Sequence, residues 1–579
     1  MTIYKSLLER GYFPKELPPN FYTEQFAVFA AGVHGSQFVS GYQPAHNYTE
    51  CITYQLAQPH MARELRIPNP ASFAKLAELV SLRFGRLLKL AARSKFARSR
   101  PIFATGRSRA VRPMLMPANL ARERAAIRAG SSYLLKADIS HFYPSLYTHA
   151  VGWAIDPRLR LKANWNNSRL LGKKIDQYLM NLDGKVSQGI PIGNDISFLL
   201  SEIVLADVDR RLRSKATSSF RWFDDYEFAS TTRDGAEKIL KKLKIELGRY
   251  RLRLNSAKTQ ILELPTVAQD AWLDKLREAG RVQFGTPNEV VRYFDVAFTL
   301  HGEFPSAPVL LQAVGTLFKI TRPRPEVARI AESCLTQTVL AEPGSAQKVF
   351  ALLSFWRLNG LKINSDLVTE TINEIVLRHQ AGGFSSDVAW ALFFCLEHGC
   401  ELNARAGRVL SEFSDDCIAL QALHMSAEGL LPRGFSTKQI SKVLSNADLD
   451  REHWLLAYES VRHGFLTTAT TAVQSNALFS ELLTRKVTFY RKTVPSYASI
   501  IHPGSAPSWF VRKWFDRVRA KKKRMRRDDR VADLIRKDIE ALKISPVKVD
   551  DAIRKLLNKS EPSLENQSTE VAEDSTYGQ

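Results

Sequence analysis

The chain has 579 residues, and its 82 Lys and Arg against 59 Asp and Glu give a formal net charge of +23. Hydrophobic residues make up 45% and charged residues 24%, a globular composition that excludes a wholly disordered or fibrous protein. At roughly 100–200 residues per domain, this length predicts about three or four domains. The positive charge favours a polyanionic partner, with nucleic acid first, because binding phosphates releases condensed counterions.

The cysteines and the apolar segments indicate the compartment. Five scattered cysteines form neither a disulfide framework nor a close CxxC pair for zinc. The start of the chain has no apolar run of signal-peptide length, and no later stretch approaches about 20 uncharged apolar residues. The sequence therefore predicts a cytoplasmic protein that is neither secreted nor membrane-spanning.

The first notable segment is a basic run from Arg83 to Arg112, which holds ten Lys and Arg and no Asp or Glu. Such a run is either a solvated helix face or a phosphate-contacting surface, and the complete absence of acids favours the second. It is followed, over residues 133–265, by short apolar segments that alternate with helical patterns. These patterns predict a mixed α/β domain.

Beyond this domain the pattern changes to one amphipathic helix after another. The stretch EVVRYFDVAFTL, from near Val290, resembles one more strand, and helical segments then continue to about residue 490. Their number and the shortage of strand signals predict a stacked helical array of the HEAT kind over residues 290–490, with an ordinary irregular helical domain as the alternative.

The C-terminal part has two predicted regions. Residues 491–558 are basic, and the run from Arg512 to Arg530 holds eleven Lys and Arg with aromatic residues at its start. Such a mixture serves nucleic-acid contact, or else it docks the region on the body. Residues 559–579 are acidic, polar and poor in large apolar side chains, so we expect them to be disordered.

Three carboxylates stand where strands are expected to end. Asp224 and Asp225 interrupt the strand-like FRWFDDYEF, and Asp138 ends the apolar strand of YLLKADI. Adjacent like charges in an apolar run are costly unless a cation neutralises them. Hard oxygen ligands suit Mg²⁺, and two such ions clamp the attacking and leaving oxygens of a phosphoryl displacement. Together the three acids predict metal-dependent nucleotidyl transfer.

Two further features lie in order with these acids. A Gly-rich turn from Gly189 to Gly193 precedes an apolar helix, and glycine lets a backbone approach a nucleotide or template closely. Lys258, in LNSAKTQILELP, follows the acids and suits a pyrophosphate leaving group as a cation or proton donor.

The order of Asp138, the Gln188-Gly189 turn, Asp224-Asp225 and Lys258 resembles the palm motifs of reverse transcriptases. Within that superfamily the sequence is similar to the bacterial defence-associated, abortive-infection and unknown-group enzymes with an appended helical repeat domain. The segments that carry this resemblance lie within roughly the first 265 residues: GYFPKELPPNF, LRIPNPASFAKLA, FYPSLYTHAVGWAI, GIPIGNDIS, RWFDDYEF and LNSAKTQILELP. One departure is Asn194, where relatives commonly carry proline.

The resemblance implies an α+β fold. Its N-terminal and fingers region spans 1–132 and its palm spans 133–265, and the all-α HEAT-like array and a basic C-terminal tail follow. It implies that Asp138, Asp224 and Asp225 bind two catalytic Mg²⁺ ions, with Mn²⁺ as an alternative metal, and that Tyr143 excludes ribonucleotides by standing under the sugar. Tyr143 as simple core packing is the alternative. It further implies that Gln188 and Gly189 touch the incoming nucleotide, and that a fingers arginine holds its triphosphate: Arg107, Arg109 or Arg112.

The leading hypothesis is an antiphage RNA-directed DNA polymerase that transfers dNTPs by two-metal nucleotidyl transfer. Its expected partners are an RNA template or noncoding RNA, the DNA product, and a protein partner or further copies of the chain. Priming from a protein hydroxyl is a second route to the product, and the sequence has 17 tyrosines. The alternatives are a retron or group II intron-like reverse transcriptase, and a nucleic-acid-binding scaffold with an inactive palm.

Overall fold

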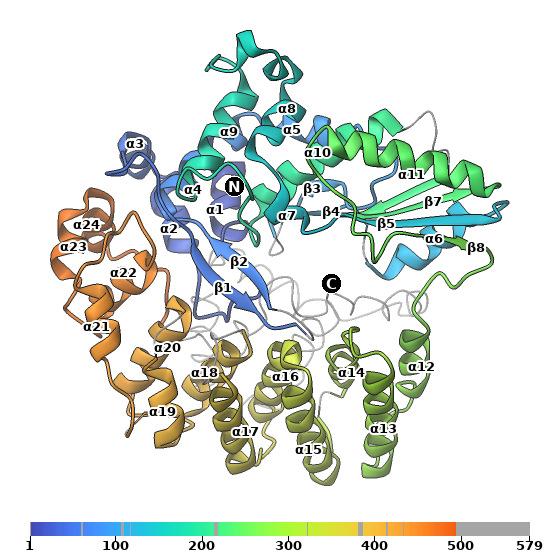
Figure 1. Ribbon diagram of the computed structural model, residues 1–579. Coiled ribbons are helices and arrows are strands. Elements are labelled where there is room, and N and C mark those ends of the chain that lie inside the picture. Colours follow the sequence, from blue (N-terminus) through green and yellow to red (C-terminus); the bar gives the residue numbers. More distant parts are fainter. Residues whose placement is uncertain are drawn as a thin grey trace, which may run out of the picture.

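The computed structural model describes residues 2–493, apart from 59–61, 106–108, 116, 213–217, 321, 380–385, 413–414 and 432. Within these residues the chain forms an N-terminal region, a four-stranded sheet with its covering helices, and a long succession of helices (Figure 1). No helix in this described part has the length and apolar character needed to cross a membrane. The predicted acidic tail 559–579 and nearly all of the predicted basic region 491–558, including Arg512–Arg530, lie outside the described residues.

The N-terminal region packs short helices around two separate hairpins. Strand β1 (Ile52–Leu56) pairs antiparallel with β2 (Arg63–Ile67), and β3 (Pro101–Phe103) pairs antiparallel with β4 (Val111–Pro113). The Asn69 side chain caps the following helix by accepting a hydrogen bond from the Ala71 amide, and Pro70 favours a helix start there. The helices are α1 (Ile3–Arg10), α2 (Glu24–Ala31), α3 (Val33–Gly41), α4 (Pro70–Leu82), α5 (Phe84–Ala91), the short 3₁₀ turn η1 (Pro117–Asn119) and α6 (Leu120–Arg128).

The central sheet is antiparallel throughout and has the strand order β6-β7-β5-β8. Helix α11 packs on one face and α6 on the other, as Figure 1 shows. The mixed α/β fold predicted here is confirmed. The strands are β5 (Tyr133–Asp138), β6 (Ser218–Trp222), β7 (Asp225–Ser230) and β8 (Gln260–Glu263). The helices are α7 (Phe142–Ser145), α8 (Thr148–Ile155), η2 (Pro157–Arg160), η3 (Lys162–Asn164), α9 (Leu171–Asn181), α10 (Asp195–Leu212) and α11 (Arg233–Gly248).

Helix α10 is buried along most of its length and packs against α5, α8 and α11. Asn194 stands at its start, where its side chain accepts a hydrogen bond of 2.9 Å from the Ser197 amide and donates one of 3.0 Å to the Pro191 carbonyl. An asparagine in this position satisfies an amide that the helix itself leaves without a partner. The residue that departs from the related sequences therefore has a local role as a helix cap.

The strand expected near Val290 is wrong, because this segment is helix α13 (Pro287–Glu303). Thr286 and Glu289 form a capping box at its start, and Pro287 occupies its first turn. Its buried side chains recur every three or four residues: Val290, Tyr293, Phe294, Ala297 and Leu300. The β-branched and aromatic composition favoured a strand, but the helical spacing and the cap decide the structure.

The C-terminal part of the described chain is helical from residue 271 to residue 484. In its central part each helix packs chiefly on the helix two positions further along the chain, so that odd-numbered and even-numbered helices form two layers. Repeats of the HEAT kind stay a prediction. The elements are α12 (Ala271–Ala279), α13, α14 (Val309–Leu317), α15 (Pro325–Ala341), η4 (Pro343–Ser345), α16 (Ala346–Leu358), α17 (Ser365–Arg378), α18 (Ser386–His398), α19 (Ala404–Leu410), α20 (Asp416–Ala427), α21 (Lys438–Leu444), α22 (Trp454–His463), α23 (Thr470–Ser475) and α24 (Ala477–Thr484).

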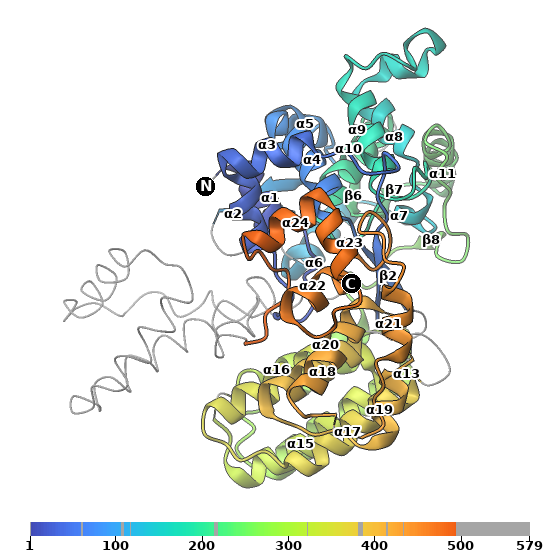
Figure 2. The same cartoon turned by 90° about the vertical axis from the view of Figure 1, so that its left-hand side faces the viewer.

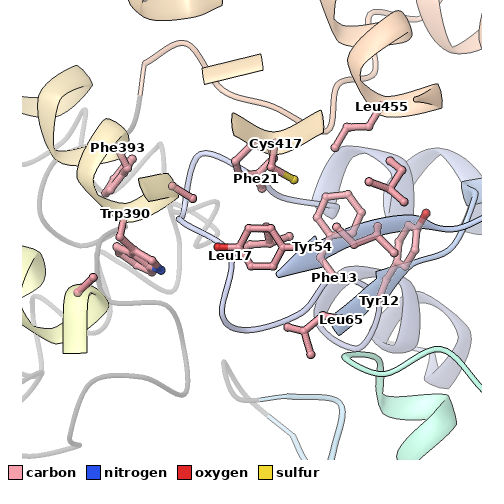
Figure 3. Packing of buried hydrophobic residues seen from close by; sticks show 14 of the residues in the cluster. Tyr12, Phe13, Leu17, Phe21, Tyr54, Leu65, Trp390, Phe393, Cys417 and Leu455 are labelled. Carbon is pink, nitrogen blue, oxygen red and sulfur yellow. The ribbon is translucent and has the colours of Figure 1, made fainter. Parts of the chain in front are cut away.

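The end of this helical region returns to the N-terminal region (Figure 2). The Tyr22 amide donates to the Phe489 carbonyl at 3.0 Å, and the Trp390 indole donates to the Glu16 carbonyl at 2.9 Å. Figure 3 shows apolar side chains of both regions in one buried cluster. Its labelled members are Tyr12, Phe13, Leu17, Phe21, Tyr54, Leu65, Trp390, Phe393, Cys417 and Leu455. The helical region is thus tied to the sheet domain by the chain at one end and to the N-terminal region by a shared core at the other.

Candidate active site

The three predicted carboxylates meet at one edge of the central sheet. Asp138 ends β5 and Asp225 begins β7, and the two residues are direct partners in the antiparallel register. Asp224 precedes Asp225 in the tight turn between β6 and β7, which Phe223 enters with a positive φ of 51°. Asp138 and Asp225, 87 positions apart in the chain, are therefore brought side by side by strand pairing.

The electrostatics of this group indicate mutual repulsion. Burial raises the pKa of Asp225 to about 7, and the charges of Asp224 and Asp138 add to the rise. Burial also raises the pKa of Asp224; Asp138 adds to the rise, whereas Arg63 and Lys258 oppose it. Partly buried carboxylates held together in this way are costly without a cation, so the cluster suits a divalent metal ion.

The donor set fits Mg²⁺ in the manner usual for phosphoryl-transfer sites. No three His, Cys, Asp or Glu side chains in the described part of the chain are already arranged to hold one ion. Mg²⁺ commonly takes one or two protein carboxylates, keeps several waters and is completed by substrate phosphates. Asp138 and Asp225, with Asp224 beside them, supply the one or two protein carboxylates that Mg²⁺ commonly takes, and the nucleotide would supply the remaining ligands.

Lys258 lies beside the carboxylates, as expected. Its Nζ is 3.8 Å from Oδ2 of Asp138, and its side chain is 68% exposed. The segment that carries it is fixed to the end of β5, because the Asn255 amide donates to the Asp138 carbonyl at 2.8 Å. An exposed cation at this position is free to reach a phosphate group bound between it and the acids.

Tyr143 and the Gln188-Gly189 turn are also neighbours. The Tyr143 hydroxyl accepts a hydrogen bond from Ser201 Oγ at 3.2 Å, and the Ile190 amide donates to the Tyr143 carbonyl at 3.2 Å. Gly189 has a φ of +88°, and a Cβ there would lie 3.3 Å from the Pro144 carbonyl oxygen, which explains the glycine. Gln188 lines a cavity of about 750 Å³ together with Ser140 and His141, which follow Asp138 by two and three residues.

The three fingers arginines have different surroundings. Arg107 lies outside the described residues. Arg112 is a half-buried member of β4, opposite Ile102. The Arg109 guanidinium binds the buried Asp195 at 2.6 Å and donates to the Gly193 carbonyl at 3.1 Å, so its contacts hold the start of α10. A triphosphate role for these arginines stays a prediction.

Arg63 is a residue that the sequence reasoning missed. It begins β2, is half-buried, and lies close enough to Asp224 and Tyr143 to act on both groups electrostatically. In the described part of the chain its guanidinium has neither a hydrogen bond nor an ion pair. A guanidinium near the three acids suits the phosphates of an incoming nucleotide, because its planar fork pairs bidentately with phosphate oxygens.

We expect Arg63→Ala to raise KM for dNTPs about tenfold or more, because a charge-assisted contact to phosphate is lost. Steady-state incorporation at varied dNTP concentration measures it, and Arg63→Lys should recover part of the loss. Arg66→Ala is the matched control, since Arg66 stands three residues along β2 and is bound to Asp183 at 2.8 Å. An equal rise in KM for both alanine variants would mean that Arg63 acts through the hairpin rather than on the nucleotide.

Comparison with known proteins agrees with this geometry. Residues 78–290 match the family described as reverse transcriptase (RNA-dependent DNA polymerase), a span that contains all three acids and Lys258. The chain therefore carries a reverse transcriptase domain. As an enzyme it is an RNA-directed DNA polymerase.

The other comparisons are more distant. No curated protein matches the chain. Among solved structures, apo telomerase from Candida tropicalis is similar at 10% sequence identity, over 63% of this chain and 74% of that chain, with a TM-score of 0.31. Telomerase from Candida albicans, in complex with the TWJ fragment of telomeric RNA, is similar at 13% identity, over 64% of this chain and 71% of that chain, with a TM-score of 0.26.

Proposed function

We propose that this polymerase uses dNTPs at a two-metal centre held by Asp138, Asp224 and Asp225. The observation that carries the proposal is the register of β5 and β7, which places Asp138 directly opposite Asp225 with Asp224 adjacent. When bound, the Mg²⁺ ions activate the attacking hydroxyl and neutralise the charge that develops on the transferred phosphate. Mn²⁺ would meet the same oxygen ligands.

The chain's own side chains divide the remaining work. The carboxylates fix where the α-phosphate and the primer hydroxyl meet. Lys258, 3.8 Å from Asp138, is placed to neutralise or protonate the pyrophosphate as its bond to the α-phosphate breaks. Arg63, near Asp224, holds the triphosphate. Gln188 and Gly189, which pack against the Tyr143 segment, contact the nucleotide.

Tyr143 sets the sugar specificity in this proposal. Its hydroxyl accepts a hydrogen bond from Ser201, and it lies close enough to Asp224 to be affected by that charge, so the ring is placed to fill the space that a ribose 2′-hydroxyl would need. We expect Tyr143→Ala to reduce discrimination against rNTPs by about 100-fold, whereas Tyr143→Phe should keep it, because the ring and not the hydroxyl excludes the ribose. The ratio of kcat/KM for dNTP and rNTP measures the effect. Unchanged discrimination between dNTPs and rNTPs in the alanine variant would mean that Tyr143 serves only in core packing.

The biological role that we propose is antiphage defence in the bacterial cytoplasm, with an RNA template or noncoding RNA and either a nucleic-acid or a protein primer. The resemblance of the palm segments to abortive-infection enzymes and the long helical region after the palm support this role. All five cysteines are free and buried, which suits a reducing compartment. The alternative of an inactive scaffold is disfavoured because the three acids and Lys258 converge.

The test combines survival and chemistry. Bacteria that express the chain from its native operon, or an Asp224→Asn, Asp225→Asn double variant, are challenged with a panel of phages. Protection by the first and not by the second supports a defence role that needs polymerisation. Nucleic acid that co-purifies with the chain is then sequenced, and DNA released only by protease indicates protein priming. A chain that incorporates dNTPs but protects against no phage would instead favour the retron-like or intron-like alternative.

A further inference from the structure

Three segments far apart in the sequence carry cations and contain no Asp or Glu. They are residues 83–95 on and after α5, residues 157–170 between α8 and α9, and residues 248–258 between α11 and β8. An ordinary solvated surface mixes charges of both signs, as α11 does with Lys238 paired to Asp234 at 2.6 Å. Three acid-free segments therefore indicate a polyanionic ligand if the fold brings them together.

The structure joins these segments by direct contacts. Arg86 of α5 binds Asp156 at 2.6 Å, and this buried acid immediately precedes η2. Arg160 of η2 lies over the Tyr250 ring at 4.8 Å and donates to the Arg249 carbonyl at 3.3 Å. The first segment thus meets the second, and the second meets the third. The acid at the first junction faces the protein interior and leaves the outer surface cationic.

A hollow lies at each end of the joined surface. The first, of about 410 Å³, is lined by Arg86, Lys89 and Arg93 of the α5 side together with Leu90 and Ile155. The second is the cavity of about 750 Å³ beside Asp138, into which the third segment contributes Arg251 and Arg253. We call the cations between and within the two hollows the cationic track; they are Arg86, Lys89, Arg93, Arg160, Arg251 and Arg253.

The segment that supplies Arg160 to the track also exposes apolar side chains. Trp165 is 55% exposed and Leu161 is 62% exposed, in a segment that carries Arg158, Lys162 and Arg169 as well. Exposed aromatic rings among cations suit unpaired bases, because every base has a face that stacks and every phosphate needs a cation. A duplex offers no free base face along its length, and a single nucleotide would fill only one of the two hollows.

We infer that the cationic track binds single-stranded nucleic acid and leads it between the outer face of α5 and the cavity beside the catalytic acids, with Trp165 stacking on a base. The inference rests on the proposed function and names where its strand binds, and this binding requires neither metal ion nor dNTP. Template RNA and product DNA share the chemistry that the track recognises.

The first test removes two cations that have no other role. Lys89 and Arg93 are exposed and make no side-chain hydrogen bond or ion pair among the described residues. We expect the full-length Lys89→Ala, Arg93→Ala variant to bind a labelled oligothymidylate of about 20 nucleotides more weakly. The slope of log affinity against log salt should flatten by about 1.4, since each single-strand phosphate contact contributes about 0.7. Fluorescence anisotropy over a salt series, without metal or dNTP, measures both.

The matched control is Lys241→Ala, Lys244→Ala on α11, which removes the same charge from another exposed helix face. It should leave the slope unchanged. Equal slopes for the two double variants would overturn the track, because the binding would then depend only on net charge. Because the binding assay contains neither metal ion nor dNTP, it measures the track apart from polymerisation, so a failure of the track and a failure of the polymerase are distinguishable.

The second test addresses stacking and the source of the strand. Trp165→Ala should weaken single-strand binding about tenfold and leave binding to a duplex of equal length unchanged, whereas Trp165→Phe should keep most of the affinity. Loss of duplex and single-strand binding in equal measure would contradict a stacking site. In the supporting case, tighter binding of oligouridylate than of oligothymidylate identifies the RNA template as the ligand, and the reverse order identifies the DNA product.

Discussion

An Asp225→Asn variant is expected to lose nucleotide incorporation by about 10³-fold or more and, at the same time, to become more stable in the absence of divalent cations. The loss follows because a neutral amide is a poor ligand for Mg²⁺. The stability increases because burial and the charges of Asp224 and Asp138 all disfavour the ionised form of Asp225. Removing one of three mutually repelling carboxylates should stabilise the fold by about 1 kcal/mol, the usual gain when a strained functional site is relaxed.

Two measurements check this prediction. Thermal unfolding with and without Mg²⁺ should show stabilisation of the unaltered chain by the ion and little further change in the variant, which tests metal binding without an activity assay. Asp234→Asn is the control, since Asp234 is an exposed carboxylate on α11 that is paired with Lys238. If Asp225→Asn incorporated dNTPs at the normal rate, or if Mg²⁺ stabilised it as much as the unaltered chain, the metal assignment would be wrong.

The three acids of the candidate site could be predicted from the sequence because their pattern is local. An apolar strand that ends on Asp138 and an aromatic strand interrupted by Asp224 and Asp225 each indicate a carboxylate at a strand end. The order of these segments indicated the resemblance to reverse transcriptases. Their meeting still required the antiparallel register of β5 and β7, which local patterns do not encode.

Residues whose role depends on a distant partner could not be assigned in this way. Arg63 lies before the residues that match the reverse transcriptase family, and only the fold of the β1–β2 hairpin brings it near Asp224. The triphosphate role of Arg109 stays a prediction, and its contact with Asp195, 86 positions away in the chain, could not be read from a local pattern. The misread stretch near Val290 is different, because the capping box of Thr286 and Glu289 was visible in the sequence and outweighs strand propensity.

The largest stability loss is expected for Arg221→Met, at about 3–5 kcal/mol, because Arg221, which lies just before the turn that carries Asp224, neutralises two buried carboxylates. Its side chain is fully buried and binds Glu202 at 3.0 Å and Asp209 at 2.8 Å. The same guanidinium donates to the Phe223 carbonyl at 2.7 Å, and the Phe223 amide donates to Ser99 Oγ at 2.9 Å. The network thus connects the N-terminal region, α10 and the turn that carries Asp224.

Substitution of Arg221 therefore tests whether this network or strand pairing fixes the turn that carries Asp224. Methionine fills much of the same volume but leaves Glu202 and Asp209 buried without their cation, so denaturant unfolding should show the full cost. Arg210→Met on α10, the helix that carries Glu202 and Asp209, should cost less than about 1 kcal/mol, because Arg210 is 46% exposed and its partner Asp207 is also bound by Arg211. Adding Glu202→Gln to Arg221→Met should recover part of the loss, since one uncompensated charge is removed. Similar costs for Arg221→Met and Arg210→Met would show that the turn is held by strand pairing alone, and the incorporation rate of a folded Arg221→Met chain would then match that of the unaltered chain.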